Sequence, residues 1–303
     1  MRYLLLLAVL LMACNPIQPT NTSPQYSSAV EAQHKIVVAV IDGVRMSESR
    51  HLPLIFGELA PQGATLRNLW NEGHTVTRPG HATMLTGVYQ WISNTPDEFP
   101  HQPTFFEYYR ESTGAAASKA YYVAGKTRLQ YTEYSDAASY GIDYAGTFIG
   151  ADTTDDVTHE TALDILQTYH PDFMLINYGE VDERGHECVL EEYLASIDRA
   201  DTLVYNLWNE LQSMPYYAGD TYLFITSDHG RHTTDYCKHG DTCEGCRQLL
   251  GVVLGPGIAV GASNTYYEQT QFCRTFGWIM GVETPLAEGW MFTDIWGNVS
   301  GIE

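Results

Sequence analysis

Several short motifs in this sequence carry carboxylate, imidazole and hydroxyl groups close to predicted strand ends. The residues concerned are Asp42, Thr77, Asp182, His186, Asp228 and His229. Carboxylates and imidazoles supply the O and N ligands that zinc binds, and a pair of zinc ions can hold both oxygens of an in-line displacement. A hydroxyl beside such ions can act as the nucleophile of a phosphoryl transfer. Each motif alone is common in turns and helix caps, so the prediction of a two-zinc site rests on the whole set.

The spacing of these residues indicates how they could meet. Asp42 follows the apolar run 36–41, and Asp228 follows the apolar run 222–227, with a glycine within two residues of each aspartate. Both carboxylates therefore emerge where the chain leaves a buried strand and turns. The motif at 182–186 places a carboxylate and an imidazole four residues apart, which puts both on one face if the segment is a helical turn.

Apolar runs predict strands, and periodic apolar positions between them predict helices. Strands are expected at 35–41, 119–125, 172–178, 221–227 and 249–254, and helices near 53–60, 80–86, 103–111, 158–168, 190–212 and 267–280. This alternation predicts an α/β fold with a doubly wound, mostly parallel central sheet and helices on both faces. Ligands in such folds bind beyond the carboxyl ends of the strands, where one pocket could gather the acidic motifs.

The N-terminal segment has the features of an export signal. A basic residue precedes an apolar core at 3–12 that is too short to span a bilayer, and a lipoprotein-type cleavage sequence follows it. We expect a lipoprotein signal over 1–14 that is cleaved before a lipidated Cys14, a flexible tether at 15–34 and one catalytic domain at 35–303. The protein would then be lipid-anchored in a bacterial cell envelope, facing the periplasm or the surface. An ordinary secretory signal with an incidental cysteine is the alternative.

The net charge of −21 argues against a nucleic-acid partner and against binding to anionic lipid surfaces, both of which select basic patches. A small anionic substrate remains compatible with it, because bound zinc would invert the local field.

The motifs together resemble those of a known group, the alkaline phosphatase superfamily, and most closely its type I phosphodiesterase and nucleotide pyrophosphatase branch. The matching segments are 40–43, 77–87, 182–186 and 226–230, with further agreement at 255–257 and 280–285, and they occur in the family's order. The resemblance covers nearly the whole mature domain. The Arg-Pro-Gly-His stretch at 78–81 also resembles the glycolipid ethanolamine-phosphate transferases of the same superfamily.

The resemblance implies a role for each motif. One zinc would be held by Asp42, Thr77, Asp228 and His229, and the other by Asp182, His186 and a third histidine. Thr77 would be the nucleophile, forming a phospho-threonine intermediate that water then hydrolyses. The residues agree with this assignment, because Pro79 suits the first turn of a helix whose N-terminus could face the phosphate. Thr75 is the alternative nucleophile, although its spacing to Pro79 matches less well.

The third histidine has two candidates, His239 and His232. His239 is favoured because it precedes Gly240 on the loop that returns to the strand at 249–254. His232 is so close to His229 that it is more simply interpreted as a loop residue.

The cysteines bear on the same loop. Cys188 follows His186 by two residues and Cys237 precedes His239 by two, so their sulfurs would be near each other if both histidines bind one zinc. We therefore expect a disulfide from Cys188 to Cys237 or Cys243. The alternative is unpaired cysteines that pack as small apolar side chains.

A further pair, Cys243-x-x-Cys246, could form half of a zinc ribbon. No second pair of this type exists in the sequence, so a disulfide-braced loop is the favoured interpretation.

Four basic residues are candidates for contact with substrate phosphate. Lys126 and Arg128 follow a predicted strand two residues apart and would point to one side of an extended chain. In some monoesterases of the superfamily, such a pair meets the extra phosphate charge, whereas a solvated strand end is the ordinary alternative. Arg78 and His81 are the other two candidates.

These observations predict a metal-dependent hydrolase that cleaves a phosphodiester or a phosphomonoester and binds two zinc ions and a small phosphate ester. The sequence does not define an oligomeric state. A sulfatase is disfavoured because that chemistry needs cysteine or serine where this chain has Thr77. The alternatives are a phosphoethanolamine or phosphoryl transferase, which normally carries several membrane spans, and an inactive lipoprotein binding module.

Overall fold

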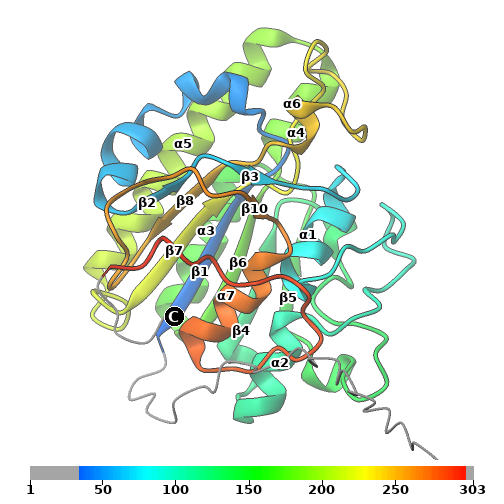
Figure 1. Cartoon of the computed structure of the whole chain (residues 1–303), viewed down its shortest axis with the longest axis vertical. Coiled ribbons are helices and arrows are strands. Elements are labelled where there is room, and N and C mark those ends of the chain that lie inside the picture. The colour runs from blue at the N-terminus through cyan, green and yellow to red at the C-terminus, as the bar shows by residue number, and fades with distance from the viewer. Residues whose placement is uncertain (1–33, 298–303) are drawn as a thin grey trace, which may run out of the picture. The chain divides into compact units, whose positions relative to one another are not determined.

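The computed structural model describes residues 34–297, which contain one large sheet with helices on both of its faces (Figure 1). Eight strands form the sheet in the order β5-β4-β6-β1-β7-β8-β2-β9, and β10 and β3 pair separately. The strands are β1 (Lys35–Ile41), β2 (Ala64–Leu66), β3 (Leu69–Trp70), β4 (Ala120–Ala124), β5 (Thr147–Gly150), β6 (Phe173–Tyr178), β7 (Thr221–Thr226), β8 (Gly251–Leu254), β9 (Gly261–Ser263) and β10 (Tyr267–Glu268).

The centre of the sheet is parallel. β1 lies between β6 and β7 and runs parallel to both, and β4 and β5 continue the parallel half. β8 is antiparallel to its neighbours β7 and β2. The central strands are uniformly buried, as expected for a sheet that is covered on both faces. The prediction of a doubly wound, mostly parallel sheet is therefore confirmed.

Seven α-helices surround the sheet within the described residues. They are α1 (Thr77–Thr86), α2 (Phe105–Thr113), α3 (Asp155–Tyr169), α4 (Glu180–Glu187), α5 (Leu190–Ser213), α6 (Glu244–Arg247) and α7 (Gln271–Met280). Short 3₁₀ turns occur at Met46–His51, Ala60–Gln62, Ala117–Lys119, Thr127–Leu129 and Ile142–Tyr144, with a π-helical turn at Ile55–Leu59.

Side-chain alternation along β1 divides the core into two halves. Ile36, Val38 and Val40 pack with residues of α1, α2 and α7, the face seen in Figure 1. Val37 and Ile41 pack on the opposite face with residues of α3 and α5. The period-two alternation of a strand thus places one helical layer on each side of the sheet.

Local sequence signals explain several helix boundaries. Thr104 and Glu107 form a reciprocal capping box at the start of α2, because each side chain accepts a hydrogen bond from the other residue's backbone N–H. α1 ends at Gly87, whose φ of 73° is the left-handed conformation that favours glycine.

The five predicted strands are all present, whereas the additional strands are short and were not predicted. β5 is partly exposed at the sheet edge and lacks a continuous apolar run. Two predicted helices need correction. The segment expected at 267–280 is helical only from Gln271, because Tyr267–Glu268 form β10, and the segment at 53–60 consists of π and 3₁₀ turns.

The described residues belong to one compact unit, and none of their helices is both long enough and apolar enough to cross a membrane. The predicted signal, the lipidated Cys14 and the tether lie outside the described residues.

Candidate metal centre

The carboxyl ends of β1, β6 and β7 meet at one edge of the sheet, near α4 (Figure 1). Asp42 directly follows β1, and Asp228 comes two residues after β7. α1 approaches this edge closely because Gly80 has no side chain, and a Cβ there would lie 2.6 Å from the backbone oxygen of Asp228. This packing brings Thr77, the first residue of α1, to the strand ends.

Asp42, Asp228 and His229 form a first cluster, with Thr77 beside it. Nε2 of His229 lies 3.4 Å from Oδ2 of Asp228, 3.7 Å from Oδ1 of Asp42 and 3.5 Å from Oγ1 of Thr77. All four side chains are fully buried. Ligands of a tetrahedral zinc lie roughly 3.3–3.8 Å apart, because each metal–ligand distance is about 2.0–2.3 Å. The three distances from Nε2 of His229 are therefore those expected between ligands of one metal ion.

Two carboxylate oxygens of the first cluster lack hydrogen bonds. Oδ1 of Asp42 and Oδ2 of Asp228 are buried and have no hydrogen-bond partner among residues 34–297. The other oxygen of Asp42 accepts a hydrogen bond of 3.0 Å from Asn177, and the other oxygen of Asp228 accepts one of 3.1 Å from the Gly43 N–H. Buried polar atoms normally find partners, so this pair of free oxygens is a candidate position for a cation.

The tautomer of His229 fits the same interpretation. Its Nδ1 lies 2.8 Å from the Gly230 carbonyl oxygen and must carry the proton to form that hydrogen bond. The lone pair of Nε2 then faces the two free carboxylate oxygens. An outer hydrogen bond of this kind is what orients metal-binding histidines.

Asp182, His186 and His239 form a second cluster. Oδ1 of Asp182 lies 3.4 Å from Nε2 of His186 and 3.3 Å from Nε2 of His239, and the two Nε2 atoms lie 3.0 Å apart. Nδ1 of His239 donates to the Thr75 carbonyl oxygen at 3.0 Å, which leaves Nε2 free to bind a metal. α4 supplies the first two residues on one face, as the four-residue spacing predicted.

The structure thus brings His239, rather than His232, to the second cluster. Nε2 of His232 instead lies 3.2 Å from a carboxylate oxygen of Asp241, in another part of the loop between β7 and β8. Thr75, the alternative nucleophile, donates its hydroxyl to the Asp241 carbonyl oxygen at 2.8 Å. Its hydroxyl is therefore engaged away from the first cluster.

Burial shifts the pKa values of the acidic and histidine side chains in the two clusters. It raises the pKa of Asp42 and of Asp228, the latter well above the ordinary value, and lowers the pKa of His229. Burial also opposes ionisation of Asp182, but the charge of Lys126 and a hydrogen bond from His186 bring its pKa well below the ordinary value. A cation between the carboxylates would relieve the cost of holding their charges away from water.

Lys126 joins the two clusters. Its Nζ lies 3.0 Å from Oδ2 of Asp42 and 2.7 Å from Oδ2 of Asp182, and the side chain is 4% exposed. Burial alone would lower the pKa of Lys126, but the charges of Asp182 and Asp42 raise it. Interpretation of this residue as a solvated strand end is therefore wrong.

Comparison with known proteins agrees with the geometry of the two clusters. The sequence profile of the family described as type I phosphodiesterase / nucleotide pyrophosphatase matches residues 36–264. The chain belongs to this family. A weaker match is to a 2,3-bisphosphoglycerate-independent phosphoglycerate mutase of Methanosphaera stadtmanae, 28% identical over 140 residues. That match covers 45% of this phosphodiesterase-family chain and 31% of the mutase, so the chain spans less than a third of that relative.

Solved structures of the alkaline phosphatase superfamily share the fold of this phosphodiesterase-family chain. The alkaline phosphatase PafA superposes with a TM-score of 0.67 at 14% identity, over 88% of this chain and 99% of PafA. A superfamily protein from Vibrio parahaemolyticus gives 0.65 at 12% identity, over 85% and 69%. A protein solved with its substrate D-glucosamine-2-N,6-O-disulfate gives 0.64 at 12% identity, over 88% and 81%. At these identities, the likeness shows the fold alone.

The side chains of Arg128 and Lys126 lie in different surroundings in this family member. The strand ends at Ala124, and the chain forms a 3₁₀ turn at Thr127–Leu129 instead of remaining extended. As a result, Lys126 is buried between carboxylates while Arg128 is exposed. The predicted pairing of the two side chains on one side of an extended chain is wrong.

Arg78 and His81 have structural partners in this phosphodiesterase-family fold. The buried Arg78 guanidinium donates to backbone oxygens of Ser93 at 3.0 Å and Glu98 at 2.7 Å, which argues against the predicted phosphate contact. His81 lies nearer the first cluster, with Nε2 3.1 Å from Nδ2 of Asn177. Burial lowers the pKa of His81 to about 3, so it is neutral and braces the amide that holds Asp42.

Two residues of the site were not predicted. Asn177 is the last residue but one of β6 and donates a hydrogen bond to Asp42, as described above. Arg231 is fully buried and donates to the carboxylate of Asp182 and, at 3.1 Å, to the Cys237 carbonyl oxygen. The position of Arg231 directly after Asp-His-Gly was the available signal, since a charged residue there must lie close to the strand ends.

A disulfide between Cys188 and Cys237 ties the second cluster together, which confirms one of the two predicted pairings. It joins the residue that ends α4 to the loop that carries His239, and its Cα atoms lie 5.1 Å apart. Within the described residues, Cys243, Cys246 and Cys273 carry no disulfide. The predicted disulfide-braced loop is therefore present, but it is braced through Cys237 and not through the Cys243-x-x-Cys246 pair.

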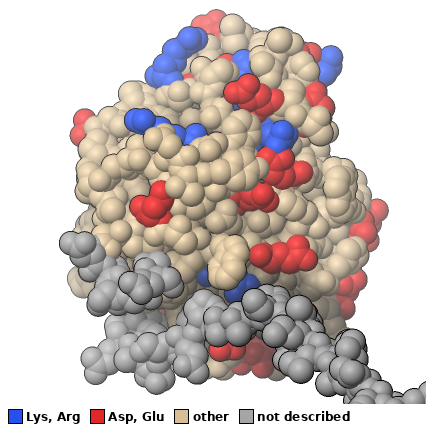
Figure 2. All heavy atoms as spheres, in the orientation of Figure 1, with Lys and Arg blue, Asp and Glu red and all other residues tan. Residues whose placement is uncertain are grey.

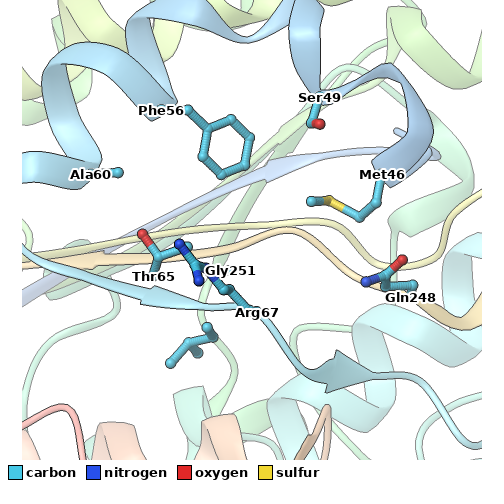
Figure 3. A pocket seen from close by; sticks show the side chains of 9 residues that line it. Met46, Ser49, Phe56, Ala60, Thr65, Arg67, Gln248 and Gly251 are labelled. Atoms are coloured by element: carbon cyan, nitrogen blue, oxygen red, sulfur yellow. The ribbon is translucent and has the colours of Figure 1, made fainter. Parts of the chain in front are cut away.

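A separate hollow of about 380 Å³ lies between the 3₁₀ and π turns and the neighbouring strands β2 and β8 (Figure 3). Its lining residues are Met46, Ser49, Phe56, Ala60, Thr65, Leu66, Arg67, Gln248 and Gly251. None of these belongs to the two clusters, and Arg67 is the one charged side chain among them. The hollow therefore adds nothing to the chemistry of the metal centre.

Proposed function

We propose that this chain is a two-zinc hydrolase of phosphate esters in which Thr77 is the nucleophile. The observation that carries the proposal is the pair of buried, unpartnered carboxylate oxygens, on Asp42 and Asp228, that face Nε2 of His229 with the Thr77 hydroxyl 3.5 Å from that nitrogen. A hydroxyl in this position lies next to the cation that the oxygens require.

The donor atoms favour zinc. One site would be held by Asp42, Thr77, Asp228 and His229, and the other by Asp182, His186 and His239. Imidazole nitrogens mixed with carboxylate oxygens suit zinc, whereas calcium and magnesium prefer oxygen ligands throughout.

The metal ions and the side chains of the chain would have different roles in the reaction. When bound, two zinc ions would lower the pKa of a hydroxyl or of water and neutralise charge on the phosphoryl oxygens. Oγ of Thr77 forms a bond to phosphorus as the bond to the leaving oxygen breaks, and the leaving group takes up the proton. Water then cleaves the phospho-threonine, which restores the Thr77 hydroxyl and releases the phosphoryl product.

Among phosphate esters, a diester is the substrate we propose. The charge of Lys126 is already shared by Asp42 and Asp182, and Arg128 is exposed, so neither is free to offset the second negative charge of a monoester. Acidic side chains are also scattered over the face shown in Figure 2. A diester, with one charge, meets less repulsion from a chain of net charge −21 than a monoester with two.

A sulfate ester is less well supported, although several structures that share the fold act on sulfated sugars by their descriptions. The sequence places Thr77 where sulfatases need a cysteine or serine. A transferase and an inactive binding module remain the alternatives that the experiment below separates from hydrolysis.

We propose further that the protein works at the bacterial cell envelope, anchored through a lipid on Cys14. The disulfide between Cys188 and Cys237 supports an exported protein, because disulfides persist in oxidising compartments. Radiolabelled palmitate should enter the full chain but not a Cys14→Ser variant. Equal labelling of both would rule out this anchor.

The function is tested with para-nitrophenyl phosphate and bis-para-nitrophenyl phosphate as substrates of the zinc-loaded chain. We expect the diester to be preferred, Thr77→Ala to lower turnover by ~10⁴-fold or more with zinc still bound, and Thr77→Ser to retain part of the rate. A full rate in Thr77→Ala would overturn the role of Thr77. Monoester preference would overturn the diester assignment, and zinc binding without hydrolysis of either ester would favour a transferase or a binding module.

A further inference from the structure

The loop between β7 and β8 contains a third group of metal-binding side chains, separate from the two clusters. His232, Asp241 and Cys243 each place a ligand atom within 4.8 Å of the other two. Nε2 of His232 lies 3.2 Å from Oδ2 of Asp241. Cys246, three residues after Cys243, is fully buried and, among residues 34–297, carries no disulfide.

We propose that His232, Asp241, Cys243 and Cys246 bind a structural zinc ion that clips this loop. Two thiols three residues apart, one imidazole and one carboxylate are four ligands of the types that zinc binds tetrahedrally. The structure brings ligand atoms of three of these residues together, those of His232, Asp241 and Cys243, and no disulfide joins Cys243 to Cys246. His232, which lies outside the second cluster, has its place in this site.

Backbone contacts already order the loop around these four residues. The Cys243 N–H donates to the other carboxylate oxygen of Asp241 at 2.8 Å, and the Thr233 N–H lies 3.4 Å from the Cys243 sulfur. The Gly230 N–H donates to the Cys246 carbonyl oxygen at 2.8 Å. N–H groups directed at a carboxylate and at a sulfur are the outer contacts that orient metal ligands.

The need for a clip follows from the length and composition of the loop. Between Thr226 and Gly251 the only regular element is the four-residue α6, and long loops of this kind are uncommon in compact domains. Much of the segment 232–245 is exposed, so burial of apolar groups contributes little to its order. A bound metal can supply the missing stability, because its binding free energy becomes folding free energy.

The clip would also support the second cluster. The Asp241 carbonyl oxygen accepts a hydrogen bond from the Thr75 hydroxyl, and the Thr75 carbonyl oxygen accepts one from Nδ1 of His239. Fixing the side chain of Asp241 therefore fixes the backbone against which His239 is oriented. The site would be structural and stands whether or not the chain hydrolyses phosphate esters.

Cobalt substitution separates this site from the two clusters. Only a site with cysteine ligands gives an intense thiolate-to-cobalt charge-transfer absorption, and neither cluster contains cysteine. The full chain, purified without reductant and loaded with Co²⁺, should show this absorption. Cys243→Ser should abolish it and lower the bound zinc by about one equivalent, as expected when a ligand is removed. Glu244→Gln, an exposed neighbour that is not a ligand, should leave both unchanged.

Two results would overturn the proposal. One is the absence of the absorption from Co²⁺-loaded chain whose two clusters are filled. The other is peptide mapping that shows a Cys243–Cys246 disulfide in the native protein, because oxidised sulfurs cannot bind zinc as thiolates. A loss of phosphatase activity alone is not a test of the structural zinc site. His232→Gln serves as the second variant and should weaken zinc retention without creating or removing a thiol.

Discussion

The two clusters of the metal centre are built in opposite ways. Asp42 and Asp228 of the first cluster follow adjacent central strands, and every side chain of that cluster is buried. The second cluster combines α4 with the long loop after β7, and the side chain of His186 is 51% exposed. The core of the sheet therefore holds the first cluster, whereas the second depends on Arg231 and a disulfide.

This difference in construction suits the two clusters to different tasks: the first to fixed geometry and the second to the entry of substrate and the release of product. Ligands on strand ends move only if the sheet moves, which suits the cluster beside Thr77, the proposed nucleophile. Ligands on a loop can shift to admit substrate or release product, and they need dedicated braces to return to the same geometry. We therefore expect the first cluster to bind metal tightly and the second to bind it more weakly.

The largest contrast should appear when one ligand is removed from each cluster. Asp228→Asn should eliminate the first metal and lower diester turnover by ~10³-fold or more, because the buried site cannot recruit another ligand. His186→Gln should weaken the second metal by about 10–100-fold, a loss that added zinc rescues. Zinc content by mass spectrometry and turnover against zinc concentration check both. Equal rescue of the two variants would contradict the comparison.

Lys126, the residue shared by the clusters, should show the next largest effect. Lys126→Met leaves the Asp42 carboxylate buried without its cation and Asp182 with Arg231 alone, which should destabilise the metal-free protein by about 3–5 kcal/mol. Zinc should restore part of that stability, because it neutralises the same carboxylates. Arg128→Met, on the exposed neighbour, should have little effect. Urea unfolding with and without zinc measures these differences, and a metal-independent loss would show that Lys126 acts only in packing.

The sequence predicts the first cluster better than the second. Asp42 and Asp228 follow strong apolar runs, and the parallel sheet necessarily brings the ends of those runs together. The second cluster depends on how an irregular loop closes, and no periodic pattern encodes that. His239 was distinguished from His232 only by its neighbouring glycine and by its position near the returning strand.

The site residues that the sequence misplaced or missed are explained by an unrecognised turn or by an unrecognised hydrogen-bond partner. Lys126 and Arg128 separate because the chain enters a 3₁₀ turn, and the guanidinium of Arg78 is taken by backbone oxygens. Arg231 was missed because its partners lie on α4 and on its own loop. Backbone carbonyl groups are present at every residue, so a sequence gives no signal of which ones an arginine will bind.

Asp155, which contacts the start of the helix α4 that carries Asp182 and His186, should make the stability of the protein depend on pH. The carboxylate of Asp155 accepts a hydrogen bond of 3.2 Å from the N–H of Glu180, the first residue of α4. Burial raises the pKa of Asp155 to about 8. The folded protein then keeps a proton that the unfolded chain loses near pH 4. Stability should therefore fall by up to about 1.4 kcal/mol per pH unit as the pH rises toward 8, and no further above it.

The matched variants for this prediction lie on one helix. Asp155→Asn keeps the acceptor for Glu180 and should remove the pH dependence between pH 5 and pH 8. Asp164→Asn, which is exposed on the same helix, should retain the dependence of the wild type. Melting temperatures across the pH range compare the three proteins. Parallel curves for wild type and Asp155→Asn would show that this carboxyl is not the source.

The smallest expected effect concerns the disulfide, which acts on the second cluster alone. The double variant Cys188→Ser with Cys237→Ser opens a link between residues 49 apart in sequence, and should lower the stability of the metal-free protein by about 2–3 kcal/mol. Because the link joins α4 to the loop of His239, only the second step of a zinc titration should weaken. Wild type that has been reduced and alkylated should behave in the same way. If both steps weaken together, the disulfide stabilises the whole domain, and the two clusters are not held independently.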